Sequence, residues 1–575
     1  MLDKNMEFTG FVEALGSNGE GIVRSEGTTF FAPYTLTGEK VKLKALKVKN
    51  KIGYAKVLEV YTPADERVRP VCKNFMRCGG CQLQHVKYTS QLKLKQKTVR
   101  DALVKIAGID TEVLPTIKSD EPFAYRNKLQ IPVGVGADGQ NVIGFFAERS
   151  HRIVPLKTCP IHPEWAETVI AVFYTYMEKC GLCGYDDATG RGDIRSIVVR
   201  DVAGNLIVTV VATHRDLKGI GELIRLLSEK LSSFSLYLNL NDADTNVVFG
   251  EEFILLHGAG RYTATECGIK YEVGANTFIQ VNSGVCRKLY DRTVKAAAES
   301  GCTAAIDCYS GGGLMTAMLA KTLGKAYGIE IVREAVDCAD GLKSLNKLQD
   351  KMSNRCGKVE DILPSVLEEV DADQCFLVVD PPRKGVDRAT LRAILKSGVK
   401  KMAMISCDPA TMARDAGILT GALTEIDGEL RKNPDYRKNG GGHFKIQCVQ
   451  PFDMFPQTKH VETLVLLSKK KPDSHIVVDV EFGEGEGKIS LKDALKRTEG
   501  RKPKSKTTYK DIQNYVEENY GFKVHTAYIA EVKRNLGLPM YDAPNAVEEL
   551  KRPRSHPTEK MVLAIKETLA HFEII

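Results

Sequence analysis

The sequence predicts an α/β protein whose main domain is a Rossmann-like, doubly wound parallel sheet. A small β-barrel and a cysteine-containing, β-rich region precede this domain, and a small helical extension follows it. Two patterns carry the prediction. Between about residues 302 and 470, short apolar strands alternate with helical sequence, as in a parallel sheet with helices on both faces. Residues 1–60 alternate β-type runs with glycine-containing turns, which is typical of a small five-stranded, OB-like barrel.

Length and composition restrict the class of protein. The chain has 575 residues, so roughly three or four domains are expected. Hydrophobic residues make up 43% and charged residues 27%, as in ordinary globular protein. No apolar run approaches the ~18 residues that span a bilayer, and Asp3 and Glu7 lie where a signal peptide needs apolar sequence. We therefore expect an intracellular protein with no membrane partner. We also expect it to be cytoplasmic and monomeric.

The positive charge is concentrated at the start of the chain. Residues 1–110 contain 19 Lys and Arg against 11 Asp and Glu, whereas the rest of the chain holds 62 of each sign. In the barrel, Lys40, Lys42, Lys44 and Lys47 fall on the polar side of an alternating strand. Such a basic surface suits a polyanion such as RNA, and an ordinary solvated face explains it equally well.

Shifts in composition divide the chain into five segments. Residues 120–280 are mostly β-type, with helices expected near 162–179 and 216–232. The predicted segments are an OB-like barrel at 1–62, a cysteine-containing β-rich domain at 63–280, the α/β domain at 281–470, a linker with one strand near Ile476–Val480 at 471–508, and a helical extension at 509–575.

Three cysteines near residue 75 form a candidate metal site. Cys72, Cys78 and Cys81 lie close together, and Gly79-Gly80 lets the backbone fold tightly between two of them. Cys159, which precedes a proline, is a candidate fourth ligand of an iron–sulfur cluster. The alternative is a tetrahedral zinc site, in which Cys180 and Cys183 pair with Cys78 and Cys81. The spacing alone favours neither.

A glycine-rich turn follows the first strand of the α/β domain. Asp307 ends the run Ala304–Asp307, and Gly311-Gly312-Gly313 leads into a helix. The second strand ends at Glu330, whose carboxylate can bind a ribose diol. The turn lacks the Gly-x-Gly-x-x-Gly pattern that pyrophosphate binding requires. It therefore fits S-adenosylmethionine, which contains no pyrophosphate, better than it fits NAD.

Two later strands end in polar residues at the edge of the sheet where ligands bind. The first ends at Asp380-Pro381-Pro382-Arg383, and the second ends at Ser406-Cys407-Asp408-Pro409. Cys407 should lie just before a helix, whose N-terminus can lower the pKa of a thiol and favour the nucleophilic thiolate. A buried, inert cysteine is the alternative. Glu462 opens a late strand, where it is either a general base or a solvated carboxylate.

These motifs resemble, in the same order, those of the RNA uracil-5-methyltransferases, and in particular the branch that carries an iron–sulfur cluster and acts on 23S ribosomal RNA. The resemblance covers residues 1–470. The N-terminal barrel resembles a TRAM domain. The motifs are the four cysteines, Phe278–Asn282, the Asp307–Gly313 turn, Glu330, Asp380–Arg383, Ser406–Pro409 and His460–Glu462.

The resemblance implies S-adenosylmethionine and a [4Fe-4S] cluster as cofactors and RNA as the partner. It makes Cys407 the nucleophile that adds to C6 of uracil, and Glu462 the base that removes the C5 proton. The other implied roles are methyl-donor binding by Gln280, Tyr309, Glu330 and Asp380, uridine binding by Phe278, Gln280 and Asp380, and cluster binding by Cys72, Cys78, Cys81 and Cys159.

Two regions stay open at this level. The run Tyr125-Arg126-Asn127-Lys128 is either a further RNA contact or a surface strand. Residues 471–575 lie outside the family pattern and suit an added RNA- or ribosome-binding module or an interaction domain. A transfer-RNA uridine as the target, and a non-catalytic RNA-binding or ribosome-assembly protein, are the alternative functions.

Overall fold

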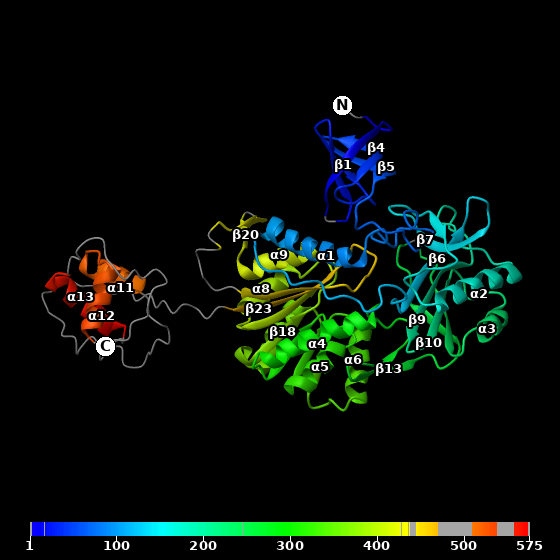
Figure 1. Ribbon diagram of the computed structural model, residues 1–575. Coiled ribbons are helices and arrows are strands. Elements are labelled where there is room, and N and C mark those ends of the chain that lie inside the picture. The colour runs from blue at the N-terminus through cyan, green and yellow to red at the C-terminus, as the bar shows by residue number, and fades with distance from the viewer. Residues whose placement is uncertain are drawn as a thin grey trace. The chain divides into compact units, whose positions relative to one another are not determined.

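A computed structural model provides the structure of the chain (Figure 1). It describes residues 3–16, 18–243, 245–426, 428–434, 436, 444–469, 509–536 and 557–572. The chain forms two compact units, Met1–Lys470 and Lys471–Ile575. The predicted linker at 471–508, with its strand near Ile476–Val480, lies outside the described residues.

The first unit begins with the predicted five-stranded barrel, which is closed in the order β1-β2-β3-β5-β4. Alternation along each strand directs apolar side chains inward, and Val23, Phe30, Val41 and Leu43 are fully buried in its centre. The lysines at 40, 42 and 44 alternate with buried residues, as expected. The strands are β1 (Glu7–Leu15), β2 (Gly21–Ser25), β3 (Thr28–Ala32), β4 (Lys40–Lys49) and β5 (Ile52–Thr62).

A seven-stranded sheet in the order β12-β11-β10-β9-β6-β7-β8 forms the middle of the unit. Helix α1 (Tyr88–Ala102) precedes it and continues as a short π-helix, η1 (Leu103–Ala107). Two helices, α2 (Trp165–Cys180) and α3 (Ile220–Ser228), share a hydrophobic core with the sheet. The strands are β6 (Lys128–Val135), β7 (Asn141–Phe146), β8 (Ile153–Pro155), β9 (Ile194–Val202), β10 (Asn205–Ala212), β11 (Phe234–Leu240) and β12 (Glu252–His257); the hairpin β13 (Tyr262–Glu266) and β14 (Ile269–Val273) follows.

The α/β domain contains a second seven-stranded sheet, in the order β17-β16-β15-β18-β19-β23-β22. Its first five strands are parallel, which confirms the predicted Rossmann-like fold. The strands are β15 (Ala304–Cys308), β16 (Ala326–Glu330), β17 (Met352–Cys356), β18 (Cys375–Val379), β19 (Lys401–Ser406), β22 (Phe444–Phe452) and β23 (Glu462–Lys469). The helices are α4 (Ser283–Glu299), α5 (Leu314–Leu323), α6 (Arg333–Leu345), α7 (Val359–Glu369), α8 (Arg388–Lys396) and α9 (Pro409–Thr420); a short 3-10 turn, η2 (Ala372–Gln374), precedes β18, and a hairpin of β20 (Leu423–Ile426) and β21 (Glu429–Lys432) follows α9.

Two features of this sheet differ from the expected parallel sheet. Strand β23 runs antiparallel to β19, and β22 runs antiparallel to β23, so the sheet ends in a hairpin. The edge strand β17 was not predicted, because its sequence contains no apolar run. Only Met352 of its residues is buried. The hairpin matters for function because it brings the start of β23 beside the end of β19.

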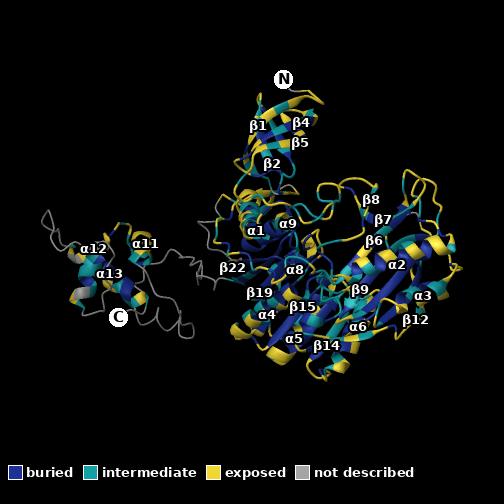
Figure 2. Cartoon of the chain, turned by 45° about the vertical axis from the view of Figure 1, so that its right-hand side comes forward, coloured by how far each residue is buried: buried dark blue, intermediate teal, exposed yellow. Residues whose placement is uncertain are grey.

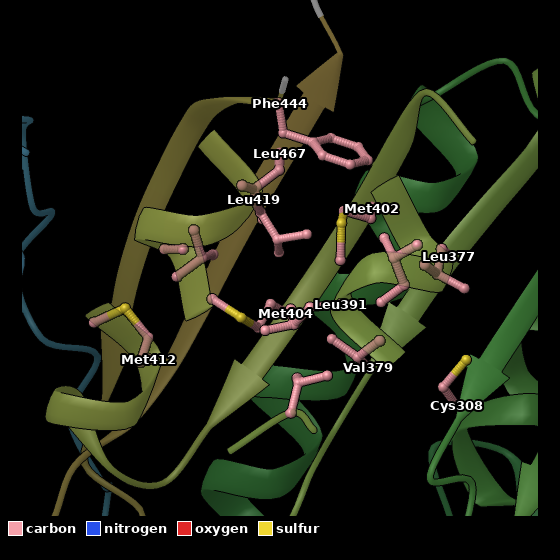
Figure 3. Close-up of a cluster of buried hydrophobic side chains, with 14 of the residues drawn as sticks. Cys308, Leu377, Val379, Leu391, Met402, Met404, Met412, Leu419, Phe444 and Leu467 are labelled. Atoms are coloured by element: carbon pink, nitrogen blue, oxygen red, sulfur yellow. The ribbon is translucent and has the colours of Figure 1, made fainter. Parts of the chain in front are cut away.

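Buried side chains hold the α/β domain together. Figure 2 shows dark blue, buried residues along the strands and mixed colours on the helices that cover them. On one side of the sheet, methionine and leucine side chains from β18, β19, α8 and α9 meet around Met402 and Met404 (Figure 3). This core fixes the strand ends from which the predicted functional residues project.

The second unit has three described helices, α11 (Tyr509–Tyr520), α12 (Thr526–Asn535) and α13 (Glu559–His571). Ile512, Val516, Ile529, Ile565 and Leu569 form its own small apolar core. In either unit, no helix among the described residues combines the length and the hydropathy needed to cross a bilayer.

Candidate active site

A cavity of about 850 Å³ opens at the carboxyl ends of β15, β16, β18 and β19. This volume is within the range of small-molecule sites, and this edge of a parallel sheet is where ligands bind. Every residue predicted to act on the methyl donor or on uridine lines this one cavity: Phe278, Gln280, Tyr309, Glu330, Asp380, Cys407 and Glu462.

The glycine-rich turn after β15 forms one wall of the cavity. Both carboxylate oxygens of Glu330 accept backbone hydrogen bonds, one from Gly311 N (3.0 Å) and one from Val332 N (2.9 Å). Tyr309 has a φ of 65°, a conformation that is uncommon outside glycine and is found at functional sites. The backbone N–H groups of Tyr309 and Ser310 both donate to Ile329 O, which ties the turn to β16.

Gly311 and Gly313 of this turn both have a positive φ, and the packing around Gly313 also excludes a side chain. The φ of Gly313 is +81°, and an added Cβ would lie 2.7 Å from Ala339 Cβ and 2.8 Å from Met352 Cε. Gly311 and Gly312 have open space where a Cβ would lie. The first two glycines therefore keep the turn open to a ligand, whereas the third allows α5 and α6 to pack closely.

Cys407 and Glu462 are neighbours because of the antiparallel strand. Ser406 at the end of β19 is opposite Thr463 of β23. Because the strands are antiparallel, residue 407, one position after Ser406, lies beside residue 462, one position before Thr463. Their charges interact, since Glu462 raises the pKa of the Cys407 thiol. Glu462 is 5% exposed, so it is a buried acid and not a solvated strand-start carboxylate.

The expected low pKa of Cys407 is wrong. Burial and then the charge of Glu462 raise the pKa of this thiol to about 11, although Arg383 opposes the change. The N-terminus of the helix stabilises the thiolate little. Its N–H groups at Ala410 (2.8 Å) and Thr411 (3.0 Å) already donate hydrogen bonds to the Asp408 carboxylate. With no substrate present, Cys407 is therefore a protonated thiol at neutral pH.

Three carboxyl groups, those of Asp307, Asp380 and Glu462, are buried in the same cavity. Burial raises the pKa of Asp307 to about 7 and that of Asp380 to about 6. Burial also raises the pKa of Glu462 well above its usual value, and the charge of Asp380 adds to this effect. A cationic ligand would stabilise the ionised forms of all three acids.

The segment between β14 and α4 forms the rim of the cavity. Asn127 Nδ2 donates to Gln280 O (2.8 Å), and Asn127 N donates to Val281 O (3.0 Å), so the middle domain holds this segment in place. The Gln280 side chain lies near Tyr290 and lowers the pKa of its hydroxyl, against the larger effect of burial. Phe278 is 74% exposed although it lines the cavity, and it therefore presents an open aromatic face at the entrance.

Among the cavity residues without a predicted role, Asp307, Tyr290 and Arg383 bear most directly on the charges in the site. Asp307 accepts a hydrogen bond from Thr316 Oγ1 (2.6 Å), and Arg383 is the cation that lowers the pKa values of Cys407 and Glu462. Arg383 is separated from Asp380 only by two prolines, so its place in this motif could have predicted that it lies in the site. Tyr290 lies within α4, and its sequence context does not distinguish it from a core residue.

The four predicted cluster ligands also come together. Cys72, Cys78, Cys81 and Cys159 line one small pocket, together with Phe75 and Phe145. Cys180 and Cys183 do not line it, so the arrangement required for the zinc alternative is not formed. Burial raises the pKa of Cys81 to about 11 and that of Cys159 to about 12. Within the described ranges, no group of three or more His, Cys, Asp or Glu side chains is arranged to hold a single metal ion.

Comparison with known proteins identifies the family. Residues 198–424 match the family model described as tRNA (Uracil-5-)-methyltransferase. An uncharacterized RNA methyltransferase of Clostridium tetani is 36% identical over 469 residues, which are 81% of this chain and 97% of that protein. Another from Listeria monocytogenes is 36% identical over 470 residues, 81% of this chain and 98% of that protein.

A solved structure has the same fold. The tRNA (uracil-54, C5)-methyltransferase of Pyrococcus abyssi, in complex with S-adenosyl-L-homocysteine, superimposes with a TM-score of 0.60 at 22% sequence identity. The match covers 80% of this chain and 100% of that one. The relatives that match four-fifths of the chain, together with the family model, show that the chain belongs to the tRNA (uracil-5-)-methyltransferase family of RNA methyltransferases.

Proposed function

We propose that this RNA methyltransferase transfers a methyl group from S-adenosylmethionine to C5 of a uridine in 23S ribosomal RNA, with Cys407 bonded to C6 of the uracil during the reaction. One observation carries the proposal. A thiol, a buried acid beside it, a glycine-rich turn with its acidic partner and an exposed aromatic ring line one cavity. The preference for 23S RNA rests on the resemblance to the iron–sulfur branch of the family.

The donor end of the cavity fits a cationic nucleoside. Glu330 is already oriented by two backbone hydrogen bonds and retains free lone pairs for a ribose diol. The positive charge of a bound ligand would compensate the negative charge of ionised Asp307 and Asp380, which burial otherwise disfavours. When bound, S-adenosylmethionine supplies a methyl group on a positively charged sulfur. Gln280, Tyr309, Glu330 and Asp380 would hold it.

Cys407 and Glu462 would carry the proton and electron-pair chemistry on the uracil ring. Once Cys407 releases its thiol proton to water, Sγ adds to C6. The electrons of the C5–C6 double bond then move into the enolate of C5, C4 and O4, which makes C5 nucleophilic. After methylation, Glu462 takes the C5 proton, and the ring electrons expel Cys407 Sγ. Arg383 favours the ionised forms of both residues.

The rim would receive the target base. A uridine must leave its stack to reach Cys407, at a cost of a few kcal/mol, and less in a loop. Phe278 offers a ring face at the entrance, and Gln280 and Asp380 offer hydrogen-bonding groups next to the donor end. These residues would hold the uracil in a cavity from which water is largely displaced.

We propose that the four cysteines hold a [4Fe-4S] cluster. Their thiols surround one pocket, and a four-iron cluster needs ligands spread around a larger body than a single ion. Purified protein should be brown and show the broad visible absorbance of iron–sulfur proteins. A Cys159→Ser variant should lose this absorbance, whereas Cys183→Ser should keep it. Colourless protein that contains stoichiometric zinc would refute the proposal.

The central experiment uses RNA that contains 5-fluorouracil. Because fluorine at C5 cannot leave as a proton does, wild-type protein should form a stable covalent complex with the RNA. Cys407→Ala should lose both this complex and methyl transfer, whereas the control Cys448→Ala, on β22, should keep both. An active Cys407→Ala variant would refute the covalent mechanism.

A tRNA uridine is the second candidate substrate, because the matching family model and the Pyrococcus structure both concern tRNA methyltransferases. Wild-type protein should be incubated with 23S RNA and with tRNA that lack 5-methyluridine, and the product mapped. Methylation of tRNA alone would reject the ribosomal assignment. Methylation of neither RNA, with binding retained, would favour a non-catalytic RNA-binding protein.

A further inference from the structure

Three cationic side chains gather beside the entrance of the cavity. Lys128 on β6 is directly opposite Arg200 on the antiparallel strand β9, so both side chains project from the same face of the sheet. Arg126 lies two residues before Lys128, and its charge interacts with that of Lys128. We call Arg126, Lys128 and Arg200 the rim cation cluster.

Arg200 is buried without a full set of partners. It is 3% exposed, and its Nη1 makes no hydrogen bond. Its Nε donates to Thr277 O (3.0 Å), and its guanidinium lies 5.7 Å from the centre of the Phe249 ring. Burying a cation without a counter-charge is costly, and such groups are normally paired.

No anion in the described part of the chain compensates the rim cation cluster. None of its three side chains forms an ion pair with a residue in that part of the chain. Burial, followed by repulsion from Arg200 and Arg126, lowers the pKa of Lys128 to about 8. These positive charges lower the folding stability because no negative charge among the described residues balances them. A negatively charged ligand would supply the missing counter-charge.

The cluster lies against the segment that forms the rim of the cavity. Arg200 holds the carbonyl of Thr277, the residue next to the exposed Phe278. Asn127, between the two other cations, holds the carbonyl of Gln280. A nucleotide whose base enters the cavity leaves its phosphates outside, at this rim.

We propose that the rim cation cluster binds a backbone phosphate of the RNA next to the nucleotide that enters the cavity. Lys128, which is half-buried, would contact the phosphate. Arg200 would supply charge from beneath and fix Thr277, and Arg126 would add charge from the side. Phosphate contacts of this kind set the register of a protein on RNA without reading its sequence. The inference rests on the proposed RNA methylation and assigns how the substrate is aligned.

An alternative counter-charge is the cysteine pocket. Arg126 lowers the pKa of Cys81, so it lies near that pocket as well. Neither Lys128 nor Arg200 is among the charges that shift the pKa of Cys78, Cys81 or Cys159. Lys128 is therefore the residue that separates the two explanations.

The test measures RNA binding by full-length protein without any methyl donor. The probes are a stem-loop RNA with one loop uridine, the same RNA with cytidine there, and a set with single uncharged methylphosphonate linkages around that nucleotide. Lys128→Gln should weaken binding of both charged RNAs about tenfold and reduce the salt dependence by about one phosphate. Lys128→Arg should bind like wild type, as should the control Lys230→Gln, an exposed lysine of the same domain.

The methylphosphonate series locates the contact. For wild-type protein, one uncharged linkage beside the loop uridine should weaken binding as much as Lys128→Gln does, and the same linkage should cost nothing further in Lys128→Gln. Equal losses in both proteins at every linkage, or unchanged affinity and salt dependence in Lys128→Gln, would overturn the inference. Altered iron–sulfur absorbance in Lys128→Gln would overturn it in favour of the cysteine pocket.

A failure of the phosphate site can be told apart from a failure of the proposed function. Binding is measured without methyl transfer, and the cytidine RNA removes any contribution from the target base. If wild-type protein makes 5-methyluridine but Lys128→Gln binds normally, the phosphate site is wrong and the methylation is right. If no methylation is found but the methylphosphonate result holds, the phosphate site is right and the proposed methylation is wrong.

Discussion

At the scale of single residues, the cavity stores acids in their neutral forms. Asp307 is 1% exposed, and burial raises its pKa from 3.8 to about 7. The folded protein therefore holds this proton more tightly than the unfolded chain. The contribution of Asp307 to stability is present below pH 4 and is lost as the pH rises towards 7.

Asp307→Asn should remove this loss while keeping an oxygen that accepts the hydrogen bond from Thr316. At pH 8 the free energy of unfolding should rise by at most about 4 kcal/mol, and at pH 3 it should not change. Urea denaturation at both pH values checks this. The exposed Glu368→Gln is the control and should show no such difference. A gain at pH 3 as large as that at pH 8 would contradict the assignment.

Arg383 tunes the nucleophile. Because its charge lowers the pKa of Cys407, Arg383→Gln should move thiol ionisation to higher pH. Alkylation of Cys407 by iodoacetamide, followed by mass spectrometry, should be slow at pH 7 and accelerate towards about pH 11 in wild type. In Arg383→Gln it should be severalfold slower at pH 9. An identical pH profile in the variant would exclude this role.

At the scale of secondary-structure elements, α1 fastens the segment that leads into Glu462. Lys95 of α1 forms a buried ion pair with Asp453, and both side chains are at most 1% exposed. Tyr88 OH donates to the second oxygen of Asp453 (2.7 Å), and Lys95 Nζ donates to Phe455 O (3.0 Å). Gln91 and Gln457 exchange two further hydrogen bonds.

Lys95→Met should lower the free energy of unfolding by about 3–5 kcal/mol, because it leaves the Asp453 carboxylate buried without its cation. Lys97→Met, which removes an exposed ion pair with Asp101 on the same helix, should cost at most about 0.5 kcal/mol. Chemical denaturation of both variants gives the comparison. Equal small losses would show that the buried pair does not hold this segment.

At the scale of the whole molecule, the chain has two units with separate cores. The relatives correspond to about 470 residues, so roughly a fifth of this chain has no counterpart in them. A chain that ends at Lys470 should therefore fold and retain methyl transfer to the RNA substrate. Calorimetry and a methylation assay test this. Loss of the main unfolding transition on truncation would show that the units depend on each other.

The local pattern of the sequence predicts most of the fold. Alternation of apolar residues gives the barrel, and short apolar runs give β15, β16, β18 and β19. Strand β17 was missed because an edge strand needs few apolar side chains. The motifs at the strand ends predicted the residues that line the cavity, since the ends of parallel strands meet at one edge of the sheet.

The sequence by itself therefore determined the barrel, the parallel strands and which side chains could act at their ends, because these depend on residue type and local periodicity. Only the tertiary structure decided the protonation states and the partners. The pKa of Cys407 rises because the thiol is buried in the cavity and because Glu462 lies beside it on a strand that runs the opposite way. The grouping of Arg126, Lys128 and Arg200 likewise depends on the register between two strands, which long-range hydrogen bonding sets.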